Sequence, residues 1–484
     1  MTTMDAPQTP AARSFCAPEA RRAVLIAAIL GSALGFIDGS IVSIALPAMR
    51  ASLGATLAEA QWFSNAYMLF LSALILAGGA LGDRFGLART FTLGIAIFIA
   101  ASLACALAPT PTFLIIARAL KGIGAALMVP GSLSLISRAY PKEERGRAIG
   151  IWAAASALTT ALGPIIGGLV LTLGGPEFWR WIFAINLPLG LLTIVILRRA
   201  VRSDPAQDDH PVDWLGAGLA TLSLGAIAYA LTALGSEDGR SDLAFAAGLA
   251  LFLAFLWHET RDPHPMMPLK LFSDARFSAA NLATFLLYAA LGAMLFYLPM
   301  AVITAWEITP IAASAAFAPL SVFISTLSTP VGKLSDRYGP ERIIGLGAAV
   351  VALAYALVAA TAPLQSYWFA TFPAMGLAGL GMAFVVAPLS AAVMGAVDDI
   401  ETGAASGINN AISRMAGLVA IAAFGSLAAA SYGAAGGALS FGVEGGGAAH
   451  RAAATTAFAA ISWCAAGLAG LSSATILIAR RQAA

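Results

Sequence analysis

The sequence predicts an all-α integral membrane protein in which fourteen transmembrane helices form two six-helix bundles plus two inserted helices. Three observations support this prediction: an apolar composition, fourteen long apolar runs, and a charged motif that occurs twice. Of the 484 residues, 59% are hydrophobic and 11% are charged, and the mean hydropathy is +0.84. A soluble domain has roughly 25% charged residues, so the lipid bilayer must be the solvent for most of this chain.

Fourteen runs are long and apolar enough to cross a membrane, for which about 20 residues are needed. The first run follows a polar tail, contains Asp38 and is too long for the core of a signal peptide. We therefore expect it to be retained as a transmembrane helix. The predicted spans are 23–47, 60–81, 90–108, 112–136, 147–172, 180–198, 213–234, 242–258, 277–300, 310–331, 342–361, 367–394, 404–430 and 455–479.

The positive charges are distributed unevenly between the loops. If the N-terminus is cytoplasmic, 20 of the 27 Lys and Arg residues fall in cytoplasmic segments. Cytoplasmic loops of membrane proteins carry such an excess. We therefore expect a multi-pass membrane protein with both termini in the cytoplasm.

The charged motif "GGALGDRFGLAR" (Gly78–Arg89) returns as "GKLSDRYGPER" (Gly332–Arg342), with matching residues 253 positions apart. Each copy lies between the second and third helix of a six-helix set. Two related bundles around a central cavity are typical of secondary transporters. The predicted organisation is a cytoplasmic tail (1–22), a first bundle (23–198), cytoplasmic linkers with two inserted helices (199–276), a second bundle (277–479) and a cytoplasmic tail (480–484).

The repeated motif suits an inner gate that opens and closes. Gly79 and Gly82 permit close helix approach, and Gly86 supplies a tight turn. Asp83 and Arg84 can pair with a neighbouring segment when the inner face is closed. The alternative is a solvated turn that only sets the topology. The predicted gate residues are Gly79, Asp83, Arg84, Gly86 and Arg89 in the first copy, and Gly332, Asp336, Arg337 and Gly339 in the second.

Ionisable groups inside a span are costly and usually functional. Asp38 is the only acid well inside a predicted span, and Arg118 is the main buried base, with Lys121 one turn later. Asp38 is the candidate for proton coupling or substrate recognition. Arg118 does not release its proton in proteins, so its predicted role is to tune proton exchange at Asp38. The alternatives are a local polar contact for Asp38 and a static ion pair between the two helices.

The remaining polar and aromatic residues suggest no further chemistry. We expect the Arg414 side chain, near the inner end of its span, to extend to the membrane interface. The aromatic residues of the ninth span can line a cavity, but packing is the favoured interpretation. Three cysteines without paired spacing predict no disulfide. The histidines, which we expect to be solvated and to form no metal site, are His210, His258, His264 and His450.

Five stretches, in order along the whole chain, resemble motifs of the major facilitator superfamily. The gate motif resembles its loop 2–3 signature, although Leu87 and Ala88 replace the usual basic pair and Pro340 and Glu341 stand in the second copy. The other four resemble motifs of its fourteen-helix drug:proton antiporter branch, with Thr159 replacing a glycine of the third. They are "FIDGSIVSIALP" (Phe36–Pro47), "IIARALKGIGAAL" (Ile115–Leu127), "ALGPIIGGLV" (Ala161–Val170) and "GINNAISRMAGLVA" (Gly407–Ala420).

The resemblance implies the major facilitator fold and proton-coupled efflux of hydrophobic, cationic small molecules or drugs across the bacterial inner membrane by alternating access. The antiporter motif it assigns to exporters is Gly163, Pro164, Gly167 and Gly168. It implies no cofactor, because the proton gradient drives transport, and no enzymatic activity, metal or nucleic acid partner. The partners are the substrate, protons and the bilayer, and we expect a monomer. The alternative is a facilitator of another class, either an importer or a transporter dedicated to one metabolite, antibiotic or siderophore. A sensor or embedded enzyme is disfavoured, because no soluble domain or catalytic cluster is found.

Overall fold

The structure is a computed structural model that describes residues 15–206, 211–234, 239–398 and 401–483. Most of the predicted N-terminal tail and His210 lie outside the described residues. Within them, fourteen helical segments are long and apolar enough to cross a membrane, which confirms the predicted number. Most of the helical segments are longer than the apolar runs that predicted them, because polar residues continue them, whereas the segment predicted over 213–234 is helical only from Trp214 to Thr232. The last begins at Gly447 instead of residue 455.

The first bundle consists of the helices that precede the inserted pair. Two of its six spans are each built from two consecutive helices. Capping fixes the start of the second span, where Thr56 and Glu59 form a reciprocal capping box. The helices are α1 (Arg21–Leu53), α2 (Leu57–Phe85), α3 (Leu87–Ala106), α4 (Pro111–Met128) followed by α5 (Gly131–Ala139), α6 (Lys142–Gly174), and α7 (Trp179–Ala184) followed by α8 (Asn186–Ala200).

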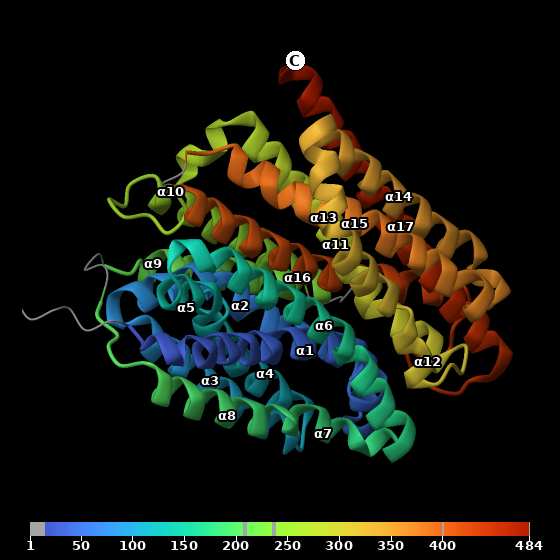
Figure 1. Cartoon of the computed structure of the whole chain (residues 1–484). Helices are drawn as coiled ribbons and strands as arrows, with labels where there is room; N and C mark the ends of the chain where they lie inside the picture. The colour runs from blue at the N-terminus through green and yellow to red at the C-terminus, as the bar shows by residue number, and fades with distance from the viewer. Residues whose placement is uncertain (1–14, 207–210, 235–238, 399–400, 484) are drawn as a thin grey trace, which may run out of the picture.

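The second bundle follows the inserted pair and packs as a separate group of helices (Figure 1). Asp274 caps its first helix by accepting hydrogen bonds from two backbone amides. Its helices are α11 (Ala275–Thr304), α12 (Pro310–Ala315) followed by α13 (Ala318–Tyr338), α14 (Pro340–Thr361), α15 (Phe372–Gly395), α16 (Thr402–Ala434) and α17 (Gly447–Ala483).

The inserted helices α9 (Trp214–Thr232) and α10 (Arg240–Glu259) pack on each other along one side of the molecule. α9 also contacts α2 of the first bundle and α16 of the second. An apolar cluster joins the elements, with Leu69 on α2, Leu224 on α9 and Leu418 on α16. The inserted pair therefore covers the place where the two bundles meet, while α10 exposes large apolar side chains of the kind that face lipid.

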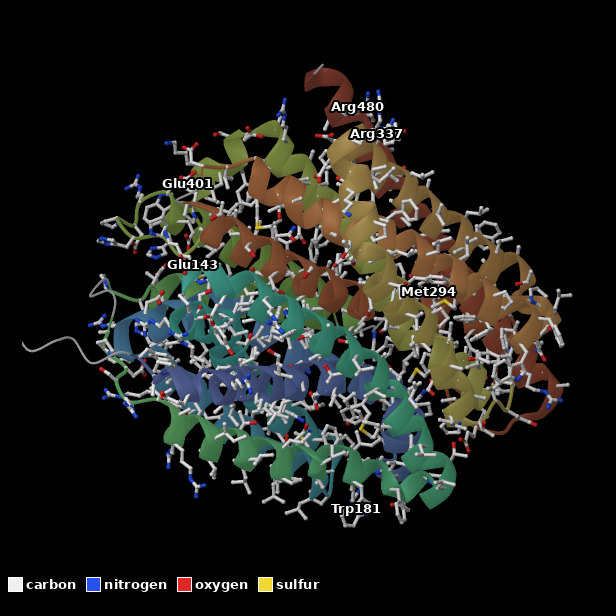
Figure 2. All side chains as sticks on the ribbon, viewed as in Figure 1. Glu143, Trp181, Met294, Arg337, Glu401 and Arg480 are labelled. Carbon is white, nitrogen blue, oxygen red and sulfur yellow. The ribbon has the colours of Figure 1, made fainter. Side chains whose placement is uncertain are left out.

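On the side formed by α6, α12 and α13, the two bundles are in contact at one end and diverge at the other, whereas α2 and α16 pack together on another side. At the predicted outer end, the amide of Ile311 on α12 donates to the hydroxyl of Thr172 on α6, over 3.1 Å. At the opposite end, Glu143 at the start of α6 and Arg337 at the end of α13 lie far apart (Figure 2). Between α6 and the helices α12 and α13, the structure is therefore closed on the predicted outer side and open on the side of the basic loops.

Candidate functional site

Three charged side chains meet inside the first bundle. α1 supplies Asp38, while α4 supplies Arg118 and Lys121, whose spacing of three residues places them on one helix face. Nη1 of Arg118 donates to Oδ2 of Asp38 over 2.6 Å, and Nζ of Lys121 donates to Oδ1. At most 2% of any of the three side chains is exposed. Both carboxylate oxygens are thus occupied by cations in a site shielded from water.

Backbone and aromatic groups hold the two cations in place. Nε of Arg118 donates to the carbonyl of Phe63 on α2, over 2.7 Å. The guanidinium of Arg118 lies 4.5 Å from the centre of the Tyr67 ring, and the ammonium of Lys121 lies 4.5 Å from that of Phe98. Ring faces attract cations, so these contacts offset part of the cost of burying a site with one positive charge in excess.

The structure brings together Asp38 and Arg118, as the sequence predicted, and adds Lys121 as a direct partner. The i, i+3 spacing of the two bases was the available signal for this role. A cationic substrate that is recognised by Asp38 needs a free carboxylate oxygen, and in this structure neither oxygen is free. Substrate recognition at Asp38 therefore stays a prediction, and a cationic substrate would have to displace Arg118 or Lys121 from the carboxylate.

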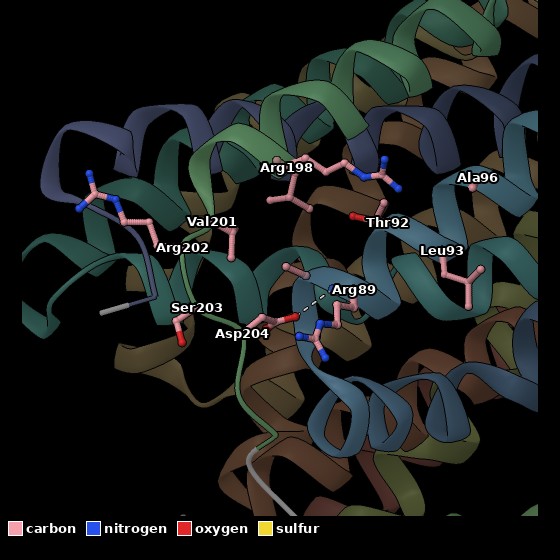
Figure 3. A pocket seen from close by; sticks show the side chains of 11 residues that line it. Arg89, Thr92, Leu93, Ala96, Arg198, Val201, Arg202, Ser203 and Asp204 are labelled. Carbon is pink, nitrogen blue, oxygen red and sulfur yellow. Dashed lines mark hydrogen bonds between the residues drawn. The ribbon is translucent and has the colours of Figure 1, made fainter. Parts of the chain in front are cut away.

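The first copy of the repeated motif is held by an acid from the linker after α8. Gly86, with φ of 100°, precedes α3 and has no side chain to cap it. Asp204 takes over this role, because its Oδ2 accepts from the amide of Arg89 over 2.9 Å (Figure 3). Its Oδ1 lies 3.3 Å from Nη1 of Arg138. A Cβ at residue 86 would lie 2.5 Å from Oδ2 of Asp204, so Gly86 makes room for this contact.

Other residues of the motif differ from the prediction or between the copies. Gly78, and not Gly79, provides the close helix approach, since a Cβ there would lie 2.1 Å from the carbonyl oxygen of Ala126. At Gly79 the nearest atom is 4.0 Å away. Arg84 is exposed and lies over the ring of its neighbour Phe85. Asp83 belongs to the last turn of α2.

The second copy faces the open side of the molecule. Gly339 repeats the positive φ, at 87°, before α14. Asp336 and Arg337 are exposed, and neither forms an ion pair with another described residue. Gly332 has no atom within 4 Å of a built Cβ. The two copies are therefore alike in backbone conformation, but only the first is held by a linker acid.

The four residues of the antiporter motif lie inside α6, where Pro164 removes one backbone donor. Gly163 and Gly167 face α1: added Cβ atoms would lie 2.1 Å from Oγ of Ser40 and 2.6 Å from the Ile41 side chain. Gly168 faces α12 of the other bundle, with Cα of Ile311 at 2.8 Å. The motif thus permits close packing both within the first bundle and between the bundles.

The expected solvation of all histidines is wrong for His258 and His450. His258 lies 2.8 Å from Asp213, the residue that caps α9, and 3.4 Å from Asp262. These three residues could each offer one ligand atom to a metal ion, and the ligand atoms lie within 4.8 Å of one another. The predicted absence of a metal thus stays a prediction. His450 is 3% exposed and is bonded to the hydroxyl of Tyr432.

Arg414 is also misplaced by the sequence prediction. It lies well inside α16 and within electrostatic range of Tyr67 on α2 and Tyr288 on α11. Its Nε donates to Oδ1 of Asn410 over 3.0 Å. The side chain therefore lies between the two bundles and does not extend to the interface. In contrast, Tyr297 packs in the core, as the favoured interpretation predicted, and its hydroxyl donates to the carbonyl of Ile421.

Comparison of the sequence with known proteins identifies one family profile and several relatives. Residues 28–422 match the profile described as the Major Facilitator Superfamily. The chain is 32% identical over 407 residues to the methylenomycin A resistance protein of Bacillus subtilis (strain 168), covering 83% of this chain and 86% of that protein. It is 33% identical over 428 residues to the lincomycin resistance protein of Streptomyces lincolnensis, covering 86% and 87%. It is 30% identical over 420 residues to the tetracenomycin C resistance and export protein of Streptomyces glaucescens, covering 84% and 76%.

Solved structures share the fold at low sequence identity. A bacterial homologue of the human lysosomal transporter Spinster has a TM-score of 0.69 at 18% identity, covering 95% of this chain and 98% of that one. A D-xylose–proton symporter has a TM-score of 0.65 at 15% identity, covering 94% and 97%. At these identities the likeness extends to the architecture alone.

Proposed function

The chain belongs to the major facilitator superfamily, and from this premise we propose that it exports hydrophobic small molecules in exchange for protons. It is a multi-pass membrane transporter and not an enzyme. The proposed location is the bacterial inner membrane, with both termini in the cytoplasm, and the proposed functional unit is a monomer. Transport needs no cofactor, because the proton gradient supplies the energy.

One observation supports proton coupling above all: the buried contact of Asp38 with Arg118 and Lys121. Arginine does not lose its proton at physiological pH, so Asp38 and Lys121 are the members of the site that can gain or lose one. A proton on Asp38 would weaken both ion pairs. Protonation would therefore loosen the contact between α1 and α4, which links a proton to a change in packing.

The antiporter motif provides a route from this site to the other bundle. Ser40 and Ile41 follow Asp38 on α1 and contact Gly163 and Gly167 of α6. The same helix contacts α12 through Gly168. A shift of α1 after protonation would thus reach the outer contact between the bundles. Alternating access needs this contact to open while the inner side closes.

Export is favoured over import by the relatives that carry resistance in their names, one of which is named an export protein. These relatives are each named for a single antibiotic. A second candidate function is therefore a transporter dedicated to one antibiotic or metabolite. It uses the same proton site, and the two candidates differ only in the number of substrates accepted.

The test uses purified protein in liposomes with an acidic interior. The probes are ethidium as a cation, dansyl-taurine as an anion and lincomycin as an antibiotic. We expect accumulation of at least one probe that collapses when an uncoupler removes the gradient and in Asp38→Asn. Accumulation of one probe alone would favour a dedicated transporter. Accumulation that persists without the gradient, or no accumulation of any probe, would overturn the proposal.

A further inference from the structure

Arg414 is a cation inside the membrane without an acidic partner. Its only hydrogen bond to another described residue is the one from Nε to Asn410, which lies one turn earlier on the same helix. No carboxylate among the described residues pairs with it. A charged group in a span is costly unless something compensates it. The two terminal nitrogens of Arg414 therefore remain available for a ligand.

Both bundles contribute polar groups near this guanidinium. The helices that carry Tyr67 and Tyr288, α2 and α11, both pack against α16, and both tyrosines lie within electrostatic range of Arg414. Neither hydroxyl has a hydrogen-bond partner among the described residues. Tyr297 on α11 differs, because its hydroxyl is bonded to both Gln61 and Ile421. The guanidinium of Arg414 and the hydroxyls of Tyr67 and Tyr288 thus come from three helices of the two bundles, and each has a donor without a hydrogen-bond partner among the described residues. Hydroxyl and guanidinium groups in this arrangement suit the oxygen atoms of an anion.

The charge balance of the membrane interior also favours an anion. Among the described residues, the middle of the spans contains one acid, Asp38, and three bases, Arg118, Lys121 and Arg414. Asp38 is already paired with two of these bases. The remaining field is positive, and in a medium of low dielectric constant it acts strongly on a charged substrate. It attracts an anion and repels a cation.

The surroundings of Arg414 also suit an apolar body. Met68, next to Tyr67 on α2, and Met415 on α16 are partly buried in the cluster that joins both bundles to the inserted helices. Flexible thioether side chains adapt to apolar molecules of different shape. The substrate that fits is therefore an amphiphile with an apolar body and one acidic group.

We propose that Arg414 is the anion-recognition residue of the transport site, and that Tyr67 and Tyr288 assist it. The substrates are hydrophobic molecules that carry a carboxylate, a sulfonate or another acidic group. This inference rests on the proposed transport function, and it replaces the preference for cationic substrates that the family resemblance implied. A substrate that enters from the open inner side would reach Arg414 between α2, α11 and α16, next to the proton site, because the ring of Tyr67 also contacts Arg118.

Binding measurements on the whole protein in lipid nanodiscs test the proposal without a proton gradient. The probes share a dansyl group and differ in charge: dansyl-taurine is an anion, dansylamide is neutral and dansylcholine is a cation. We expect the wild type to bind dansyl-taurine at least about tenfold more tightly than dansylcholine, as one charge-assisted contact allows. Equal binding, or a preference for dansylcholine, would overturn the proposal whatever the variants do.

The variants identify the residue responsible. Arg414→Gln should weaken dansyl-taurine binding by about tenfold and leave dansylamide binding nearly unchanged. Arg414→Lys keeps the charge and should retain part of the affinity. Arg199→Gln, which removes an exposed arginine in the last turn of α8, is the matched control and should change the binding of neither probe. Unchanged selectivity in Arg414→Gln would overturn the proposal. If Arg414→Gln does not fold, the dansyl-taurine affinity of Arg414→Lys is compared with that of the wild type. A partial loss would support the role of Arg414, and an unchanged affinity would contradict it.

Failure of the inference and failure of the proposed function give different results. Loss of proton coupling would be seen as transport that ignores the gradient in liposomes, while anion binding in nanodiscs would persist. Gradient-driven transport of ethidium but not of dansyl-taurine would support the exporter and overturn the role of Arg414.

Discussion

Lys121 and Asp38 form a direct ion pair inside the first bundle, and both side chains are fully buried. Arg118 occupies the other carboxylate oxygen, so the site contains two cations and one anion. Breaking a buried ion pair is costly because it leaves an uncompensated charge. The movement of a proton between Asp38 and Lys121 would remove both charges of that pair at once. This makes Lys121 a candidate proton carrier beside Asp38.

Replacement of Lys121 by arginine separates its charge from its ability to release a proton. Arg keeps the positive charge but does not deprotonate at physiological pH. If Lys121 carries the proton, Lys121→Arg should lower gradient-driven uptake into liposomes by at least about tenfold, or roughly 1.4 kcal/mol. Downhill exchange of substrate should continue. Wild-type uptake in Lys121→Arg would show that Lys121 acts only as a charge and would leave the proton to Asp38.

The contact of Asp204 with α3 predicts a local effect on the first copy of the repeated motif. Asp204→Ala removes the acceptor for the amide of Arg89, in a helix whose own cap residue is Gly86. Loss of an N-cap costs about 1 kcal/mol. We expect the first turn of α3 to exchange amide hydrogen about fivefold faster, measured by mass spectrometry in nanodiscs. Ser203→Ala, at a neighbouring hydroxyl without a described hydrogen bond, should leave the exchange unchanged.

The sequence predicted the architecture well, because each span is an apolar run long enough to cross a membrane. It also identified Asp38 and Arg118, since ionisable residues inside a span are rare. It could not place Asp204, which lies 115 residues from Arg89 in the chain. The side chain of Arg414 was misplaced for a different reason. The predicted span 404–430 nearly coincides with α16, but the side chain was expected to extend to the interface, whereas its Nε is bonded to Asn410.

Glycine contacts likewise depend on which face of a helix meets its neighbour, and adjacent glycines differ. A Cβ at residue 78 would lie 2.1 Å from the backbone oxygen of Ala126, whereas at residue 79 the nearest atom is 4.0 Å away. Gly78→Ala should therefore destabilise the first bundle by roughly 1–3 kcal/mol, the usual range for overpacking. Gly79→Ala should be tolerated. Thermal unfolding in detergent compares the two variants, and equal melting temperatures would contradict the assigned contact.

The outer contact between the bundles predicts a shift in conformation. A Cβ at Gly168 would lie 2.8 Å from both Cα of Ile311 and the carbonyl oxygen of Pro310, and these backbone atoms have little freedom to move. Gly168→Ala should destabilise the outer-closed state by roughly 1–3 kcal/mol. Because the outward-open state lacks this contact, its population should rise about tenfold for each 1.4 kcal/mol. The same helix offers a matched control, since Gly150 has no atom within 4 Å of a built Cβ.

Spin labels on the outer side measure this shift. Leu173→Cys and Glu307→Cys place labels on the two bundles at exposed positions, in a background where the exposed Cys464 is replaced by alanine. Gly168→Ala should add a population with a longer distance between the labels, and Gly150→Ala should not. A distance distribution in Gly168→Ala identical to that of the parent would mean that α6 and α12 do not hold the outer side closed. The route from Asp38 through α6 to the second bundle would then have to be abandoned, while the proton site itself would stand.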